Sequence, residues 1–596
     1  MPMAKIAQNQ RKTVNSELKQ SILVSKKSFI IAGFFSLFIN LLMLVPPLYM
    51  LQLYDRVLIS RSEETLIMLT IIVVVLFITM GLLEIVRSKI LVKVGNKLDS
   101  ILSQRVFDSL FELANKFPGK ASSLPLADLT AIRQFMTGNG LFAFFDAPWI
   151  PIYIAVLFMF HPVFGYFAIF AAIVLVIFTI VNEYSTKTKL AEANALNRAS
   201  TMFVDSNLRN AEVINAMGMK NSIGANWREK YYGFLNAQNE ASNKAGIWSN
   251  LSKSSRMLFQ SLILGVGGYL AIKSEVSPGM MIAGSIIMGR ALAPLDLIIN
   301  SWKGFSSART SYQRLDSLLN DFPKDMEYMK LPAPKGEVLL ENVVVIPPGA
   351  QQPSIKGISM KIDKGDVVGI IGPSAAGKSS LARIILGLWP LAAGTARLDK
   401  ADISQWDKVD LGQYIGYLPQ DIELFEGTVS QNIARFGEID ANKVVEAAQK
   451  AGVHEMILRL PDGYDTKIGA GGATLSGGQR QRIGFARAIY NNPVLVVLDE
   501  PNSNLDDQGE AALVEAVKSL KETNTTVILI THRPSILQVT NKLAMIRQGV
   551  LELYGNTNEV LAKISANAKQ AQAQPQTQAA RPQTAAPTIS LSKPSS

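Results

Sequence analysis

The stretch Gly372-Pro373-Ser374-Ala375-Ala376-Gly377-Lys378-Ser379 decides the fold of the C-terminal half of this chain. An apolar run at residues 366–371 precedes it and predicts a strand, and residues 380–388 follow with the pattern of a helix. In this strand–loop–helix context, glycines let backbone N–H groups approach phosphate oxygens, and the helix N-terminus adds partial positive charge. From Gly336 onward, short β-rich runs alternate with helical patterns. The sequence therefore predicts an α/β domain with a P-loop and a mostly parallel sheet.

Two further features of this domain suit phosphate chemistry. Lys378 is placed to neutralise β- and γ-phosphate charge, and the Ser379 hydroxyl can bind Mg²⁺. The apolar run at residues 494–498 predicts a buried parallel strand that ends in Asp499 and Glu500. Asp499 is expected to hold Mg²⁺, and Glu500 to polarise an attacking water.

The N-terminal half contains six apolar runs that predict membrane spans. About 20 apolar residues are needed to cross a bilayer core. Six such runs before residue 300 are hard to reconcile with buried helices of a soluble protein. The first run is also far longer than the apolar core of a signal peptide. The runs are residues 29–53, 65–86, 141–160, 162–181, 257–272 and 278–299.

Basic residues fix the expected topology. The chain carries 59 basic and 48 acidic residues, and the excess lies in residues 1–28, 87–140 and 183–256. Basic flanks stay in the cytoplasm, so the N-terminus, both long loops and everything after residue 299 are expected there. Both loops are expected to be helical extensions of the spans. The charge therefore does not require nucleic-acid binding, and the absence of cysteine excludes disulfides and thiolate metal sites.

Four charged residues fall inside the predicted spans: Glu84, Asp146, Arg290 and Asp296. Charges within a span usually face protein or water. Six residues separate Arg290 from Asp296, about 9 Å along a helix, so pairing within one helix is strained. Arg290 is expected to face a carboxylate on another helix or a water-filled route. The structural reading is a buried pair that fixes helix register, and the functional one is a polar wall for an unfolded chain.

The motif Leu475-Ser476-Gly477-Gly478-Gln479 resembles the signature of the ATP-binding cassette family. The other motifs of that family follow in order: Gln420 at the Q-loop, Ser503 to Asp506 at the D-loop, and His532 at the switch position after a strand at residues 526–530. The resemblance implies ATP and Mg²⁺ as ligands. It implies catalytic roles for Glu500, His532 and Gln420, and Mg²⁺ ligation by Ser379, Gln420 and Asp499. The nucleotide-binding residues that it implies are Gly372, Pro373, Ser374, Ala375, Ala376, Gly377, Lys378, Ser379, Ser380, Ser476, Gly477, Gly478 and Gln479.

The resemblance also implies a dimer. In the family, one ATP lies between the P-loop of one cassette and the signature of another. This chain carries one P-loop, one signature and six predicted spans, half of what family exporters use, so a homodimer is expected. One position departs from the family: the usual adenine-stacking aromatic residue is replaced by Pro347. Base stacking is therefore expected to be weaker, or to come from another residue, which bears on nucleotide selectivity.

Spans followed by a fused cassette resemble an exporter. Shorter motifs are similar to the type I protein secretion ATPases of Gram-negative bacteria, in the protease, lipase and haemophore branch. They are Phe145 to Trp149, Ala216 to Met219, and Gly289 to Pro294. Such exporters work with a periplasmic adaptor and an outer-membrane channel, and move unfolded polypeptides that carry a C-terminal signal. A lipid or amphiphile exporter of the same architecture is the alternative, and a non-transport regulator is a third possibility that the intact Glu500 and Gln479 disfavour.

The expected organisation has five parts. Residues 1–28 form a cytoplasmic segment, 29–300 a six-helix membrane domain, 301–335 a linker, 336–562 the cassette, and 563–596 a disordered tail rich in Ala, Gln, Pro, Thr and Ser. The inner membrane is the expected location, with both termini in the cytoplasm.

Overall fold

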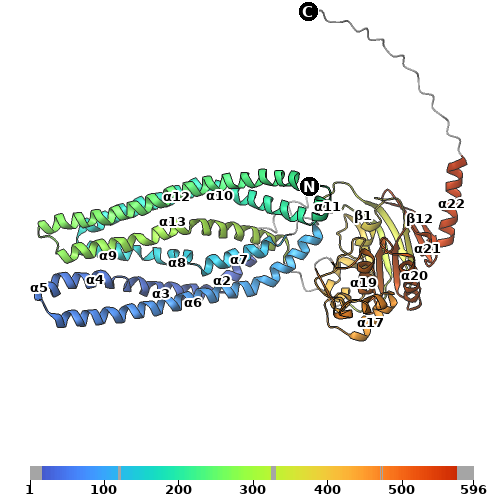
Figure 1. Ribbon diagram of the computed structural model, residues 1–596, viewed down its shortest axis with the longest axis horizontal. Helices are drawn as coiled ribbons and strands as arrows, with labels where there is room; N and C mark the ends of the chain where they lie inside the picture. Colours follow the sequence, from blue (N-terminus) through green and yellow to red (C-terminus); the bar gives the residue numbers. More distant parts are fainter. Residues whose placement is uncertain (1–15, 118–121, 324–330, 470–471, 473, 574–596) are drawn as a thin grey trace, which may run out of the picture. The chain divides into compact units, whose positions relative to one another are not determined.

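A computed structural model describes residues 16–117, 122–323, 331–469, 472 and 474–573 (Figure 1). The chain divides near residue 324 into a helical unit and an α/β unit, each with its own hydrophobic core. The helical unit consists of α2 (Glu17–Leu23), α3 (Lys26–Leu42), α4 (Val45–Gln52), η1 (Leu53–Val57), α5 (Leu58–Ser60), α6 (Glu63–Lys116), α7 (Leu124–Thr137), α8 (Asn139–Asp146), η2 (Ala147–Trp149), α9 (Ile150–Phe160), α10 (Pro162–Leu208), α11 (Ala211–Ala216), α12 (Lys220–Ile272) and α13 (Pro278–Asp321).

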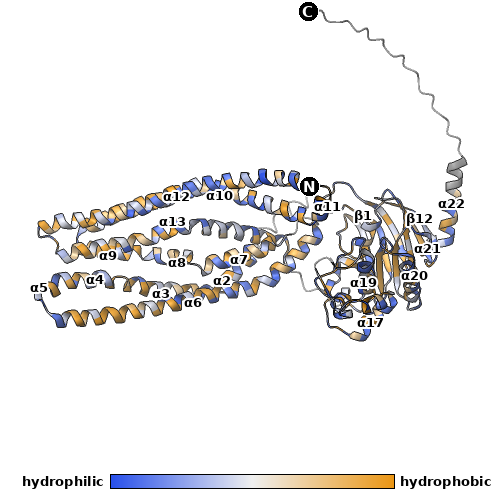
Figure 2. Ribbon diagram, viewed as in Figure 1, coloured by the Kyte–Doolittle hydropathy of each residue, from blue (hydrophilic) through white to orange (hydrophobic). Residues whose placement is uncertain are grey.

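The six predicted spans are confirmed as helical segments long and apolar enough to cross a membrane. The predicted helical extensions are also present, because α6, α10 and α12 continue for many residues beyond their apolar parts. Figure 2 shows α10 and α12 becoming more hydrophilic toward α11. The first and third spans are broken: α4 and α9 each begin with prolines, which lack the N–H that a continuous helix needs.

Two of the charged residues in the spans, Asp146 and Asp296, pair with arginines on other helices. Asp296 pairs with Arg256 of α12 and accepts a hydrogen bond from Ser252 at 2.7 Å. Asp146 pairs with the buried Arg87 of α6 at 2.8 Å. Arg290 is exposed in the protomer, and its nearest polar contact is the Met43 sulfur at 4.0 Å.

The α/β unit contains three sheets. Their strands are β1 (Val338–Val345), β2 (Ile355–Ile362), β3 (Val367–Ile371), β4 (Ala393–Leu398), β5 (Ala401–Asp402), β6 (Ile415–Leu418), β7 (Gly427–Thr428), β8 (Lys467–Ile468), β9 (Leu495–Asp499), β10 (Thr526–Ile530), β11 (Lys542–Arg547) and β12 (Val550–Asn556). The largest sheet has the order β12-β11-β3-β10-β9-β6 and is parallel except at β11–β12. A second, antiparallel sheet has the order β2-β1-β4-β5.

Helices flank these sheets (Figure 1). They are α14 (Lys378–Ile385), η3 (Ile403–Gln405), α15 (Lys408–Gly412), α16 (Val429–Ile433), α17 (Ala441–Lys450), α18 (His454–Leu458), η4 (Gly463–Asp465), α19 (Gly477–Ile489), α20 (Asp507–Glu522), α21 (Pro534–Leu537) and α22 (Thr557–Ala573).

Two expected boundaries differ from the structure. The segment expected to be a helix and linker does begin as helix, but as an unbroken continuation of the sixth span, because α13 runs on to Asp321. The tail expected to be disordered from residue 563 begins inside α22, which continues to Ala573. α13 continues because Leu315, Leu318 and Leu319 keep a buried apolar stripe close to its end. α22 continues through Ala, Lys and Gln, which have good helix propensity, and the sequence gives no stop signal there. Residues 1–15, 324–330 and 574–596 lie outside the described residues.

Candidate active site

Four parallel strands bring the predicted site residues to one edge of the large sheet. β3, β10, β9 and β6 are consecutive neighbours, and in register Ile530 pairs with both Ile370 and Asp499. The carboxyl ends of parallel strands meet at the same edge. The P-loop follows β3, Glu500 follows β9, His532 lies two residues beyond β10, and Gln420 lies two residues beyond β6. Segments 160 residues apart in sequence therefore converge at this edge.

The P-loop requires glycine at two positions. Gly372 has φ +155°, and a Cβ there would lie 2.1 Å from the Ile546 carbonyl oxygen. Gly377 has φ +101°, and a Cβ there would lie 2.7 Å from the Ser354 carbonyl oxygen. Both the left-handed backbone and the close approach exclude a side chain. The loop is thus held against the main chain on two sides, and the Ala376 N–H donates to the Pro373 carbonyl oxygen at 3.2 Å within it.

Lys378 opens α14 directly after this loop. Its ammonium donates hydrogen bonds to the carbonyl oxygens of Gly372 at 2.9 Å and Pro373 at 3.0 Å. The ammonium therefore lies back across the loop that a phosphate chain would occupy. Positive charge, the α14 N-terminus and the exposed loop form a site suited to polyphosphate.

Asp499 and Ser379 form the oxygen-rich part of the site. Asp499 is 2% exposed, and the Ser379 hydroxyl lies near its carboxylate. Burial raises the pKa of the Asp499 carboxyl, and the Ser379 hydroxyl opposes that shift. The Asp499 Oδ1 atom is buried with no hydrogen-bond partner among the described residues. A buried, unsatisfied carboxylate oxygen beside a hydroxyl fits Mg²⁺, which prefers oxygen ligands.

Glu500 lies next to the end of β9 in an uncommon backbone conformation. Its φ is +49°, in the left-handed region, and its N–H donates to the Ile530 carbonyl of β10 at 2.9 Å. Its carboxylate accepts a hydrogen bond from Gln420 Nε2 at 3.0 Å. The structure thus joins two of the three predicted catalytic side chains, and it directs the Gln420 amide to Glu500.

His532 is exposed at the same edge, and no hydrogen bond links it to Glu500 among the described residues. Its neighbour Thr531 is buried and bonds to Asn502, in the segment after Glu500, at 3.2 Å. His532 therefore lies at the same edge of the sheet as Glu500, without a hydrogen bond to it among the described residues.

The signature motif begins α19. Ser476 and Gln479 form a capping box there, with Ser476 itself exposed. A Cβ on Gly478 would lie 2.8 Å from the Asn504 carbonyl oxygen, so the motif lies against the D-loop. Across the described part of the chain, no hydrogen bond joins residues 476–479 to the P-loop. The structure therefore does not bring the signature and the P-loop of one chain together.

Gln481 is a residue that sequence reasoning missed. It is 1% exposed, and its amide nitrogen donates to the carbonyl oxygens of Pro501 at 2.5 Å and Glu500 at 3.3 Å. Its amide oxygen accepts from Ser503 at 3.3 Å. This side chain links the signature helix to the backbone of the predicted base. The only sequence signal was its place two residues after Gln479.

Pro347 lies in the connection between β1 and β2. That connection reaches the P-loop, because the Ser354 carbonyl lies against Gly377. Pro347 is half-buried, and its carbonyl accepts from the Ala350 N–H at 2.9 Å in a turn. The structure places this residue on the segment adjoining the phosphate loop, where a base-stacking side chain was expected.

Comparisons with known proteins agree with this geometry. Residues 29–293 match the ABC transporter transmembrane region, and residues 355–503 match the ABC transporter family. The chain is 42% identical over 541 residues to the type I secretion system ATP-binding protein PrsD of Rhizobium meliloti, covering 90% of this chain and 93% of that protein. It is 27% identical over 538 residues to the alpha-hemolysin translocation ATP-binding protein HlyB of Escherichia coli O157:H7, covering 89% of this chain and 76% of that protein.

A solved structure of a bacterial Atm1-family ABC exporter with ATP bound shares the fold. Its TM-score is 0.79 at 21% identity, covering 95% of this chain and all of the other. The chain therefore belongs to the ABC transporter family, as a membrane-spanning, transport-coupled ATPase of the type I secretion group.

Proposed function

We propose that this chain is the inner-membrane, homodimeric energising component of a type I secretion system that exports unfolded polypeptides carrying a C-terminal signal. The observation that carries the proposal is the 42% identity to a type I secretion ATP-binding protein through both units together. Relatives named for the translocation of alpha-hemolysin and leukotoxin add support for polypeptide cargo. A periplasmic adaptor and an outer-membrane channel are the partners proposed with it.

The proposed roles of the site residues follow from the geometry. Backbone N–H groups of residues 372–379 and the Lys378 ammonium bind the ATP phosphates. Glu500 accepts a proton from the attacking water, and Gln420 holds its carboxylate in place. His532 stabilises charge near the γ-phosphate once the edge closes around ATP. Asp499 and Ser379 hold Mg²⁺ with help from Gln420, and when bound the ion neutralises charge on the phosphates.

The homodimer is proposed because each chain supplies complementary halves of a site. Ser476 is exposed at the start of α19, and among the described residues no hydrogen bond joins residues 476–479 to the P-loop of the same chain. A second copy can bring its signature to that P-loop, and the reverse contact forms at the same time.

The topology is proposed from charge. The three basic segments flank the spans on one side, which supports a cytoplasmic location for both termini and the cassette. The long polar ends of α6, α10 and α12 then extend into the cytoplasm, where ATP is available.

Affinity purification from native membranes tests the proposal. The parent chain and a Glu500→Gln variant are cross-linked in cells and purified through a tag on the exporter. We expect a periplasmic adaptor, an outer-membrane channel and a secreted polypeptide to be recovered, with more of all three on Glu500→Gln. A Lys378→Ala variant, which should lose ATP binding, is the matched control. Recovery of none of the three partners, together with ATPase stimulation by lipid amphiphiles, would overturn the proposal.

A further inference from the structure

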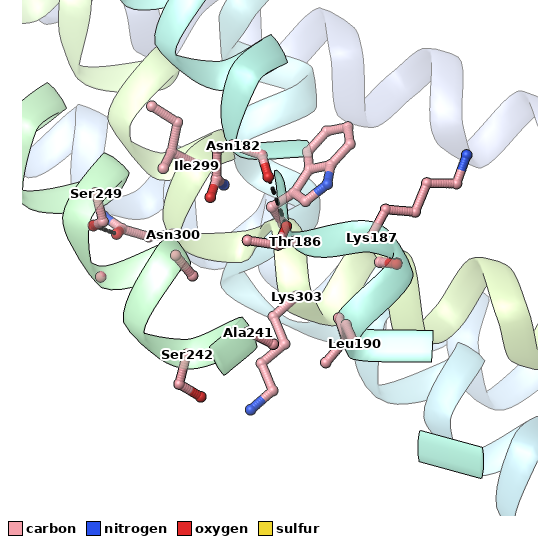
Figure 3. A pocket seen from close by; sticks show the side chains of 14 residues that line it. Asn182, Thr186, Lys187, Leu190, Ala241, Ser242, Ser249, Ile299, Asn300 and Lys303 are labelled. Carbon is pink, nitrogen blue, oxygen red and sulfur yellow. Dashed lines mark hydrogen bonds between the residues drawn. The ribbon is translucent and has the colours of Figure 1, made fainter. Parts of the chain in front are cut away.

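A cavity lies within the helical unit, between α10, α12 and α13 (Figure 3). Its volume is about 260 Å³. The walls combine apolar side chains, such as Leu190 and Ile299, with polar ones, such as Ser249 and Asn300. Ser249 and Asn300 satisfy each other through a hydrogen bond of 2.7 Å. The cavity is thus amphipathic, and part of its polar lining is already paired.

A second cavity of about 280 Å³ continues the first one along α10 and α13. The two share Lys187, Leu190, Trp302 and Ser306. We call the combined space the α10–α13 trough. On α10 it extends from Asn182 to Asn194, about 18 Å at 1.5 Å per helical residue. An extended peptide rises about 3.3 Å per residue, so the trough matches about six residues.

Asn182 marks the floor of the trough with an unmet hydrogen bond. The residue is 3% exposed, lines the first cavity, and its Oδ1 atom has no partner among the described residues. A buried acceptor without a donor destabilises the protein unless something supplies the donor. A peptide N–H is a donor of the right kind.

The rim of the trough is cationic and unpaired. Lys187, Lys303 and Arg309 line it, and within the described residues none of them forms an ion pair or a hydrogen bond. Glu183 is the single acidic residue in the lining. Nearby Lys189, in contrast, pairs with Glu192 at 3.3 Å and with Glu240 at 3.1 Å. Lys189 is therefore paired within the chain, whereas the three cations that line the trough are available to a ligand.

The cations do not converge on one point. Figure 3 shows the Lys187 and Lys303 side chains extending in different directions from the cavity. A compact anion such as one phosphate could meet only one of them. A chain with carboxylates spaced along it could meet both. Apolar walls, a buried acceptor and separated cations together describe an extended peptide with acidic side chains.

We propose that the α10–α13 trough binds an extended acidic segment of about six residues of the exported polypeptide. The inference rests on the proposed function, because it takes that polypeptide as the ligand. Backbone N–H groups of the segment satisfy Asn182, its apolar side chains contact Leu190 and Trp302, and its carboxylates meet Lys187 and Lys303.

Fluorescence anisotropy on the full chain in lipid nanodiscs tests this binding. The probe is a fluorescein-labelled, end-blocked peptide with the repeat Ala-Asp-Leu, compared with the same peptide carrying Asn for Asp. We expect the acidic peptide to bind at least tenfold more tightly. The Lys187→Gln/Lys303→Gln double variant should lose about tenfold in affinity for it, the size expected of two exposed ion pairs.

Two further variants sharpen the result. Asn182→Leu should weaken both peptides alike, because it removes the acceptor that meets their shared backbone. Lys253 is an exposed lysine of α12 outside the trough, so the Lys253→Gln variant is the control and should bind the peptides like the parent. If the double variant binds the acidic peptide as tightly as the parent, the inference is wrong. It is also wrong if the double variant keeps peptide affinity but loses retention of phosphatidylglycerol, which would make the trough a lipid site.

Secretion of cargo by whole cells separates this inference from the proposed function. If parent and double variant export equally and bind the peptide equally, the proposed function stands and the trough site is rejected. If neither the parent nor the double variant exports a polypeptide or binds the peptide, the proposed function and the trough site are both rejected. Reduced export by the double variant, with export by Lys253→Gln at the parent level, supports the trough.

Discussion

Glu500 combines a left-handed backbone with a carboxylate held by Gln420, and its chemistry can be tested without disturbing that fold. Glu500→Gln keeps the side-chain size and removes the proton acceptor. We expect ATP binding to be retained and hydrolysis to fall at least about 10²-fold, the scale of losing a general base. Phosphate release measured on purified protein checks this, with Glu515→Gln on the exposed face of α20 as control. Near-normal turnover would exclude Glu500 as the base.

Gln481 is expected to act on the reaction through the backbone of Glu500. Gln481→Leu leaves the Pro501 carbonyl without its donor and leaves the Glu500 carbonyl with the Ser503 N–H alone, so the turn after β9 is less firmly held. Buried unsatisfied carbonyls cost about 1–3 kcal/mol, so we expect kcat to drop about tenfold or more while KM for ATP changes little. Gln481→Glu, which keeps the size but loses the donor, should behave alike. A change confined to KM, or to thermal unfolding, would contradict a positioning role.

Pro347 offers no aromatic face to a nucleotide base. Stacking of a base on an aromatic side chain is worth about 1–3 kcal/mol. Pro347→Tyr should therefore raise ATP affinity by about fivefold to a hundredfold, and in the parent chain GTP should compete with ATP within about a hundredfold. Equilibrium binding of a fluorescent ATP analogue, displaced by ATP or GTP, measures both. Unchanged affinity in Pro347→Tyr would place base recognition elsewhere.

The sequence could indicate only part of the site at this scale. The P-loop, Asp499 and Glu500 were predictable because each lies in a contiguous strand–loop motif. The contacts of Gln481 and Asn182 were not, since they depend on which segments the fold brings together. The partner of Asp296 shows the same limit: its separation from Arg290 argued against pairing within the helix, but only the packing of α12 against α13 identifies Arg256.

Among the elements, the broken third span depends on one buried ion pair. Arg87 of α6 contacts Asp146 at 2.8 Å and Ser36 of α3 at 3.2 Å, and its guanidinium lies 4.5 Å from the centre of the Phe142 ring. Asp146 also accepts from Asn40 at 2.9 Å. This cluster joins three helices at the point where η2 interrupts the span.

Arg87→Met is expected to destabilise the helical unit by about 3–5 kcal/mol, because it leaves a buried carboxylate without its counter-ion. The double variant Arg87→Met/Asp146→Leu should recover most of that loss, since no charge then remains uncompensated. Thermal unfolding of detergent-solubilised protein measures both. A double variant as unstable as the single one would show that the pair contributes through its geometry and not through its charge.

Helix existence was easier to predict than helix ends. The apolar runs marked the six spans, and the apolar spacing after the second span indicated that α6 would continue. The end of α22 was missed because polar helix-forming residues give no hydrophobic pattern. The breaks at α4 and α9 follow from prolines that a hydropathy reading treats only as apolar.

At the scale of the whole molecule, substitution of Arg290 tests whether the sixth span faces a transport route. The residue is exposed in the protomer, while Asp296 six positions later is already paired. We expect Arg290→Leu to leave dimer assembly and basal ATPase largely intact while cargo export falls. Size-exclusion chromatography measures dimer assembly, phosphate release measures basal ATPase, and secretion by cells measures export. Arg309→Leu does not serve as a control, because Arg309 lines the trough. Failed assembly would favour a structural role, and unchanged export would remove Arg290 from the route.

The strand order also has a consequence for how the protein is made. β10 lies between β3 and β9 in the sheet, yet it is the last of the three to leave the ribosome. A nascent chain that ends before residue 526 has its P-loop and Glu500 but lacks the strand that sets their spacing. By then all six spans have been synthesised and domains generally fold in chain order. The exporter thus completes its membrane part before it can hydrolyse ATP, and a prematurely terminated product consumes none.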